Sequence, residues 1–487
     1  LYDDELNVNP EMLTLMRELA AVLERAGAAV EMVDLSGVSN FADAMAAHCR
    51  TSEATAFGLT ATTPQMPAAM RLAEIIRGAR PDARLILGGP HATLVHAAAR
   101  LEARRGRQGR GLAAEARLLA GFDVIVAGDG ERAIFAALEP DAPALIDADD
   151  PKSPLFLASA ELADFPPPAR HLMDVDSYRY TIDGQRALSL IAQLGCPFGC
   201  GFCGGRLSPF LRRVRTRPAA AVVEEILQLR EQYGVRGFML YDDELNVNPE
   251  VLSLMRELAA VQQERGERFH MRGFIKSQLF TAEQAEAMRA AGFRWILVGF
   301  ESGDERILEN IQKRATREQN TRCVEIAHAH GLKVKALMSA GHPGESRATL
   351  DATRDWLLAA RPDDFDLTVI TTYPGTPYFD EAELTAPGVW TYTAAGGDRL
   401  HSREVDFPRV AEYYKGAPGA YTAFVHTDFL SAPELAAARD RIEREVRERL
   451  GIAYPQGTAA QAYEHSMGQQ LPARILRRSG SASGQHA

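Results

Sequence analysis

The sequence of 487 residues lacks the features that mark several common classes of protein. It has no run of about 18 uninterrupted apolar residues, so we expect no membrane span. Its first residues are acidic and polar, which is wrong for a secretory signal peptide. The net charge of −11 and the pI near 5.7 lack the basic character of a nucleic-acid-binding protein, so we expect no nucleic-acid partner.

Cysteine is scarce as well, and its distribution is uneven. Three of the five cysteines lie within eight residues, which does not make a disulfide framework. This distribution predicts a metal site and a reducing compartment, namely the cytoplasm. The apolar share of 46% and the charged share of 24% are ordinary for a globular protein, and the length predicts two or three domains.

The N-terminal part, residues 1–145, alternates helical and strand patterns. Glu11–Ala26 has the spacing of a helix with one apolar face. The expected strands are Val30–Leu35, Ala56–Thr60, Leu85–Gly88 and Val124–Ala127. Alternation of this kind predicts an α/β domain with a Rossmann-like, doubly wound parallel sheet. We expect the first strand of such a sheet to be missing.

The rest of the chain divides into a linker, a barrel and a C-terminal segment. Residues 146–187 are rich in Pro and Asp and predict a linker. In residues 188–384 the expected strands are Leu188–Leu194, Gly237–Tyr241, Phe269–Ile275, Trp295–Phe300, Val334–Ser339 and Leu367–Thr371. Helical patterns separate them, which predicts a partial (β/α)6 barrel. For residues 385–487 we expect a small, mostly helical domain on the substrate side, with a helix at Ala432–Leu450 and a disordered tail.

One segment occurs twice. Leu1–Val22 and Leu240–Val261 differ only at Met12/Val251 and Thr14/Ser253. The second copy follows an expected strand and begins a helix, whereas no strand precedes the first copy. We interpret the first copy as a recent segmental duplication or an assembly artefact that occupies the place of the missing strand.

The three clustered cysteines, Cys196, Cys200 and Cys203, have the spacing C-x3-C-x2-C. Thiolates are the ligands of iron–sulfur clusters, and three on one short loop reach three corners of a [4Fe–4S] cubane. The fourth iron is then open to a small molecule. A zinc site or buried thiols are the alternatives, although zinc usually requires four ligands. We expect Cys49 and Cys323 to be buried apolar residues.

This loop, with Phe202 before its last cysteine, resembles that of the radical S-adenosylmethionine (SAM) superfamily. The resemblance implies a [4Fe–4S] cluster whose open iron binds SAM and cleaves it to a radical. It also implies SAM-binding residues at the carboxyl ends of the barrel strands, where barrel active sites lie. These are Phe202, Asp242, Asp243, Glu244, Glu301, Ser302, Gly341 and Tyr373.

Each of these segments has a plainer interpretation. The acidic run that begins at Asp242 is also compatible with a solvated loop. Ser302 or Asp304 could be a helix N-cap. The loops after the fifth and sixth strands, which contain Gly341 and Tyr373, could be tight turns.

Three loops of the N-terminal domain share a Gly-rich or polar character at the ends of strands. Joined to a radical SAM barrel, they resemble the cobalamin-binding domain of cobalamin-dependent (class B) radical SAM enzymes. The residues implied are Thr62, Thr63, Pro64, Gln65, Gly88, Gly89, Pro90, His91, Gly128, Asp129, Gly130 and Glu131. The D-x-H-x-x-G motif that supplies a cobalt ligand in many such domains is absent, and we do not expect His91 to replace it.

The leading functional hypothesis is a cobalamin-dependent radical SAM methyltransferase that methylates an unactivated carbon of a small-molecule or natural-product intermediate. The resemblance implies SAM, cobalamin and the cluster as cofactors, with a flavodoxin- or ferredoxin-type electron donor. The sequence names no catalytic residue of its own. A radical SAM cyclase or rearrangement enzyme of the same architecture is one alternative. A non-catalytic protein that binds SAM or corrin is the other.

Overall fold

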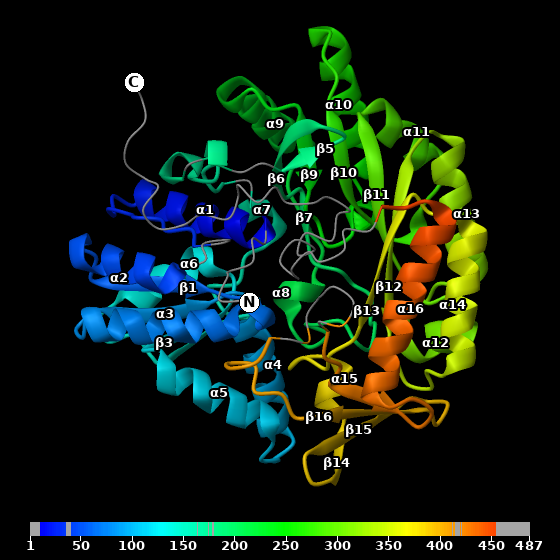
Figure 1. Cartoon of the computed structure of the whole chain (residues 1–487). Helices are drawn as coiled ribbons and strands as arrows, with labels where there is room; N and C mark the ends of the chain where they lie inside the picture. Colours follow the sequence, from blue (N-terminus) through cyan, green and yellow to red (C-terminus); the bar gives the residue numbers. More distant parts are fainter. Residues whose placement is uncertain are drawn as a thin grey trace.

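The protein has three parts that follow one another along the chain (Figure 1). The computed structural model describes residues 10–35, 40–162, 164–173, 175–177, 180–411, 413, 419 and 421–453. The N-terminal domain and the larger sheet lie side by side, and the C-terminal elements pack against both. None of the described helices is long and apolar enough to cross a membrane.

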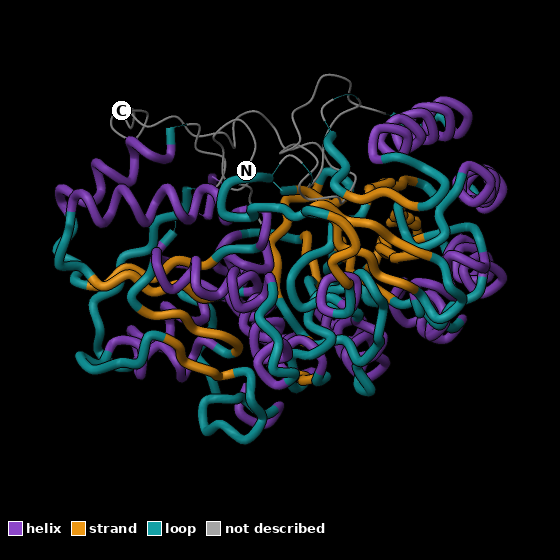
Figure 2. The backbone as a smooth tube through the Cα atoms, turned by 90° about the horizontal axis from the view of Figure 1, so that it is seen from below, coloured by secondary structure: helices purple, strands orange, loops and turns teal. Residues whose placement is uncertain are grey.

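The N-terminal domain is a parallel sheet with the strand order β1-β2-β3-β4. Its strands are β1 (Ala56–Thr60), β2 (Arg84–Gly88), β3 (Val124–Gly128) and β4 (Leu145–Ala148). Its helices are α1 (Pro10–Arg25), α2 (Phe41–Thr51), α3 (Met66–Ala79), α4 (Pro90–Arg104), α5 (Arg110–Gly121) and α6 (Gly130–Leu138). Leu85 and Leu87 point to one apolar cluster while Ile86 points to another, so helices cover both faces (Figure 2).

The strand expected at Val30–Leu35 is not formed, and that prediction is wrong. The residues form no regular secondary structure, although Val30 and Val33 still pack against apolar clusters. The reason is the absent central strand. In a doubly wound sheet the segment would pair with that strand, but among the described residues β1 is the edge of the sheet. Residues 1–9 lie outside the described part of the chain.

The central part is the expected curled sheet of six parallel strands. The order is β13-β12-β11-β10-β9-β6, and β5 (Thr181–Ile182) pairs antiparallel with β6. The parallel strands are β6 (Gln185–Leu190), β9 (Gly237–Leu240), β10 (His270–Ile275), β11 (Phe293–Glu301), β12 (Lys333–Ala340) and β13 (Asp364–Val369). The connecting helices are α9 (Ala219–Tyr233), α10 (Val251–Arg265), α11 (Ala282–Ala290), α12 (Glu305–Ile311), α13 (Arg317–Ala329) and α14 (Arg347–Ala360).

The C-terminal part differs from the mostly helical domain that was expected. It contains a four-stranded antiparallel sheet, order β14-β15-β16-β17, and the helix α16 (Ala432–Leu450). The strands are β14 (Glu383–Ala386), β15 (Val389–Thr393), β16 (Arg399–Arg403) and β17 (Val425–Thr427). The expected tail, residues 479–487, lies outside the described residues.

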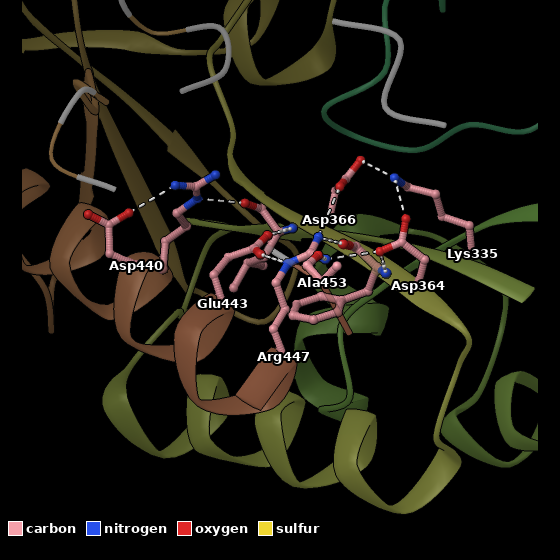
Figure 3. A network of polar contacts seen from close by, with 10 residues as sticks. Lys335, Asp364, Asp366, Asp440, Glu443, Arg447 and Ala453 are labelled. Atoms are coloured by element: carbon pink, nitrogen blue, oxygen red, sulfur yellow. Dashed lines mark hydrogen bonds and ion pairs between the residues drawn. The ribbon is translucent and has the colours of Figure 1, made fainter. Parts of the chain in front are cut away.

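Helix α16 closes the open edge of the barrel with side chains in place of a further strand. Glu443 accepts a hydrogen bond from the Leu367 N–H at 2.7 Å, and Arg439 donates to the Leu367 carbonyl at 2.8 Å. Arg447 lies between Glu443 and Asp364, at 2.8 and 3.1 Å (Figure 3). Backbone groups that an edge strand leaves unpaired are thus satisfied.

The N-terminal domain contacts the barrel directly through helix α4 and through a buried ion pair. A Cβ added to Gly204 or Gly375 would lie 3.1 Å from the Leu94 side chain. Asp129 at the end of β3 and Arg215 in the barrel pair at 2.7 Å, and each is 2% exposed. A buried pair of this kind fixes how two domains sit, because separating it leaves two unpaired charges.

A cavity of about 280 Å³ lies beside this ion pair, between the two domains. Glu18 of α1 and Glu131 of α6 both line it. Burial raises the pKa of Glu18 to about 7 and that of Glu131 to about 8, and Glu18 adds to the rise at Glu131. The two domains therefore meet around two carboxyl groups that repel each other when ionised.

Replacing Glu443 by Ala should lower the free energy of unfolding by about 3 kcal/mol, because Arg447 and the Leu367 N–H lose a buried acceptor. Chemical denaturation followed by circular dichroism measures this. Glu448→Ala, an exposed position of the same helix, is the matched control and should change little. Equal stability of the two variants would show that α16 does not hold the barrel edge.

Replacing Glu18 by Gln should flatten the dependence of stability on pH. The folded pKa of about 7 lies above the ordinary 4.5, so the stability that this group supports is complete below pH 4.5 and is lost as pH rises towards 7. The variant should match the wild type at pH 4.5 and exceed it by about 1–2 kcal/mol at pH 8. Denaturation curves at both pH values, with the exposed Glu139→Gln as control, decide this. Parallel pH profiles for wild type and Glu18→Gln would contradict it.

Candidate functional site

The cysteine loop leaves the barrel at the carboxyl end of β6 and is closed at its base. The two-residue strands β7 (Gln193–Leu194) and β8 (Arg215–Thr216) pair antiparallel on either side of it. The loop carries the short helix α8 (Pro209–Arg212). Gly195 has a φ of +86°, and a Cβ there would lie 1.9 Å from the Arg213 carbonyl, so only glycine permits this closure.

Two carboxylates at the end of β9 hold the chain just before the first cysteine. Asp242 accepts hydrogen bonds from the N–H groups of Ala192 and Gln193, at 2.7 and 3.0 Å. Asp243 accepts one from Gly195 at 2.6 Å. Burial raises the pKa of Asp242 to about 7, and its second oxygen has no partner. Both residues therefore lie in the site. That they bind SAM stays a prediction.

The three thiols of the loop differ in exposure. Cys200 is buried and Cys196 half-buried, while Cys203 is exposed. Burial nevertheless raises the pKa of Cys203, and the charges of Cys200 and Cys196 raise it further. The influence of these two charges on the pKa of Cys203 places the three thiols within electrostatic reach of one another. Burial also raises the pKa of Cys196 to about 11.

Three thiols on one loop are compatible with a four-iron cluster. Within the described ranges no three Cys, His, Asp or Glu side chains are close enough to hold one metal ion. A cubane is wider, so its three thiolates stand apart around it. Metal binding would deprotonate the thiols despite their raised pKa values. Cys49 and Cys323 are buried in separate apolar clusters, as expected.

The end of β11 carries a residue with a strained backbone. Glu301 has a φ of +66°, beside an irregularity in the ladder to β12. Its carboxylate binds Lys313 at 2.9 Å and accepts from Ser339 at 2.7 Å. Burial raises the pKa of Glu301, but Lys313 and then Ser339 lower it below its usual value. Such backbone strain in a non-glycine residue is typical of functional sites.

A histidine that the sequence analysis did not select connects Glu301 to the cysteine loop. His342 is fully buried, and its Nε2 lies 2.7 Å from the Ser339 hydroxyl. Its ring meets the Phe202 ring edge-on at 5.4 Å between centroids. Burial lowers the pKa of His342 to about 3, so it is neutral. Phe202 is thus positioned by the loop after β12.

Two buried lysines were also missed. Lys313 pairs with Glu301, whereas Lys276 follows β10 directly and lies with its Nζ 4.3 Å from the centre of the Phe198 ring. Glu244 faces both: burial raises its pKa, and Lys313 and Lys276 oppose that rise. Lys276 could have been found from the sequence, because it is a polar residue at the carboxyl end of a barrel strand, where active-site residues lie. Lys313 follows a helix, and its sequence position carries no such signal.

The remaining candidates in the barrel match the plainer interpretations more closely. Asp304 is the N-cap of α12 and accepts from the Ile307 N–H at 3.1 Å. The Ser302 hydroxyl bonds Thr353 at 3.1 Å. Gly341 forms a turn with a φ of +87°, and Tyr373 packs in an aromatic group with Phe407 and Tyr413. SAM binding by Ser302, Gly341 and Tyr373 stays a prediction.

The three loops predicted to bind cobalamin meet at one edge of the N-terminal sheet. Thr63 bonds the His91 Nδ1 at 3.0 Å, and Thr93 accepts from the Gly128 N–H at 2.9 Å. Burial lowers the pKa of His91 to about 3. The predicted residues at this edge are Thr62, Thr63, Pro64, Gln65, Gly88, Gly89, Pro90, His91, Gly128, Asp129, Gly130 and Glu131.

The residues at this edge fit a cofactor with polar groups around its rim. Glu131 has a buried carboxylate oxygen without a partner and lines the cavity between the domains. This oxygen lacks a hydrogen-bond donor, and the amide side chains of a corrin ring are donors of that kind. Asp129, in contrast, is engaged by Arg215. Contact of these individual residues with cobalamin stays a prediction.

Comparison with known proteins agrees with both halves of the site. The model of the radical SAM superfamily matches residues 190–357, and the model of the B12 binding domain matches residues 16–119. An uncharacterized methyltransferase of Pyrococcus horikoshii is 26% identical over 340 residues, 67% of this chain and 68% of the relative. An anaerobic magnesium-protoporphyrin IX monomethyl ester cyclase of Rubrivivax gelatinosus is 25% identical over 66% of this chain and 58% of its own length.

A solved structure shares the whole architecture. The radical SAM methyltransferase TsrM from Kitasatospora setae, solved with tryptophan and a SAM analogue, superposes with a TM-score of 0.65 at 18% identity. The match covers 93% of this chain and 92% of TsrM. TsrM has also been solved with cobalamin and a [4Fe–4S] cluster bound. This chain combines the B12 binding domain and the radical SAM domain, and it belongs to the cobalamin-dependent radical SAM enzymes.

Proposed function

We propose that the protein is a cobalamin-dependent radical SAM methyltransferase that methylates an unactivated carbon of a small-molecule or natural-product intermediate. The observation that carries this proposal is the direct contact between the two cofactor edges. The Asp129–Arg215 pair joins the third loop of the N-terminal domain to the strand that closes the cysteine loop. Leu94 lies against Gly204, next to Cys203. Cofactors held at these edges would lie close enough to act on one substrate.

The residues of the chain itself bind and orient the cofactors and shield the site from water. Asp242 and Asp243 hold the backbone before the cysteines, and Phe202 against His342 holds the loop from the other side. When bound, the cluster with SAM supplies radical chemistry and cobalamin supplies a methyl carrier. Lys313 and Ser339 fix the buried carboxylate of Glu301, which would meet polar groups of SAM when SAM is bound. The protein therefore contributes positioning and exclusion of water.

The substrate side lies between the N-terminal domain and the C-terminal segment. The guanidinium carbon of Arg110 in α5 lies 3.6 Å from the centre of the Phe379 ring and 4.4 Å from that of the Trp390 ring. Next to it, His91 and Phe407 line a small cavity of about 30 Å³. This cavity is much smaller than the several hundred Å³ of pockets that hold small molecules, so it marks only one edge of the interface. An external flavodoxin- or ferredoxin-type protein as electron donor, and the cytoplasm as compartment, belong to the same proposal.

A cyclase is the second candidate, because one relative carries that name. It would use the same cluster and SAM site but end in ring closure instead of methyl transfer. A protein that binds SAM or corrin without turnover remains the third hypothesis, because of the copied segment at residues 1–22. Product analysis separates the three.

Anaerobic reconstitution with iron, sulfide and cobalamin, followed by addition of SAM and a reductant, tests the proposal. A methyltransferase should form both S-adenosylhomocysteine and 5′-deoxyadenosine, and its product should gain one methylene unit in mass. A cyclase should form 5′-deoxyadenosine and a product that has lost hydrogen. Absence of both SAM-derived products from a fully loaded protein would contradict any catalytic role.

Replacing Cys200 by Ala should abolish the cluster, because only two thiolates remain to hold it. Iron content should fall from about four per chain to near background, with loss of 5′-deoxyadenosine formation. Cys323→Ala is the control, since Cys323 is buried in the apolar core of the same barrel. Full iron content in Cys200→Ala, or its loss in Cys323→Ala, would contradict the assignment of the ligands.

A further inference from the structure

Lys276 is a buried cation at the cysteine loop, and no described residue pairs with it. It is 2% exposed, and no hydrogen-bond acceptor or ion-pair partner in the described part of the chain reaches its ammonium. Lys313, by contrast, pairs with Glu301 at 2.9 Å. A buried ammonium without a partner costs several kcal/mol, so a structure keeps one where an anion balances it.

The position of Lys276 is set from two sides. Its backbone N–H donates to the Asn246 side chain at 2.8 Å, and Asn246 donates back to its carbonyl at 3.0 Å. Its Nζ lies 4.3 Å from the centre of the Phe198 ring, and Phe198 stands between Cys196 and Cys200 in the loop. Lys276 is thereby held over the part of the loop that carries two of the three thiols.

The electrostatic surroundings agree with this placement. Burial lowers the pKa of Lys276 first and Lys313 lowers it further, whereas Cys200, Glu244 and Cys196 raise it. The anions that face Lys276 from the neighbouring elements are therefore the cysteines and Glu244. A cluster with three thiolate ligands is anionic, and it becomes more so when it accepts an electron.

We propose that the Lys276 ammonium is the counter-charge of the [4Fe–4S] cluster and sets its reduction potential. The electron comes singly from a low-potential donor, either dithionite in the test or a flavodoxin- or ferredoxin-type protein. It reduces the iron core, and no bond breaks in this step. A fixed cation beside the cluster stabilises the reduced form more than the oxidised form. This inference needs only the cluster, so it holds whichever group the enzyme transfers.

The experiment is a redox titration of the anaerobically reconstituted full chain, with mediators and dithionite, followed by electron paramagnetic resonance in the absence of SAM. Lys276→Met removes the charge at similar length. We expect at least a tenfold lower ratio of reduced to oxidised cluster at a given potential. For one electron this corresponds to a reduction potential that is more negative by about 59 mV. Lys276→Arg keeps the positive charge, so its reduction potential should lie close to that of the wild type. Lys333→Met, at an exposed lysine paired with Asp183, should leave the potential unchanged.

Iron and sulfide content, with circular dichroism, shows whether each variant is folded and loaded. Lys276→Gln is a second neutral variant in case Lys276→Met does not take up the cluster. Loss of the cluster from both neutral variants, but not from Lys276→Arg, would also support a counter-charge. An unchanged potential in a loaded neutral variant overturns the proposal. A change confined to SAM affinity overturns it too, and would assign Lys276 to the bound SAM instead.

Discussion

The tether between two carboxylates of β9 and the backbone before the first cysteine is the constraint on which the site depends. Asp242 and Asp243 together accept three N–H groups over residues 192–195. Each of these buried N–H groups would otherwise lack an acceptor, which costs about 1–3 kcal/mol. Because Asp242 is 1% exposed, no water competes for these donors. The chain therefore leaves the barrel in one direction, and the positions of all three thiols follow from it.

The same loop after β9 also organises the charges around the cysteines. Asn246 fixes the backbone of Lys276, and Glu244 faces both buried lysines. Glu301 and Lys313 neutralise each other, which leaves Lys276 and Glu244 next to the thiols. Burying charges costs several kcal/mol per ion, so such a group persists only as a nearly balanced set. One short segment thus couples the geometry of the cysteine loop to its electrostatics.

Much of this could be predicted from the sequence, and the exceptions have physical reasons. The barrel strands and helices follow from local periodicity, and the cysteine spacing points to the cluster without any tertiary information. The strand at Val30–Leu35 failed because a strand needs a neighbour, and that neighbour is absent from the described sheet. His342 and Lys313 were missed because their importance lies in contacts with Ser339 and Glu301, which are distant in sequence.

The duplicated segment separates what the sequence by itself determined from what only the tertiary structure decided. Both copies form a helix, α1 and α10, because their helix-forming residues have the same apolar period. The buried faces differ. Leu258 is fully buried in α10, whereas its counterpart Leu19 is half-buried in α1. Ala21 is buried, whereas its counterpart Ala260 is exposed. Local propensity determines the helix in both places, but the surfaces that a helix meets decide which side is buried, because the apolar stripe is wide enough to pack either way.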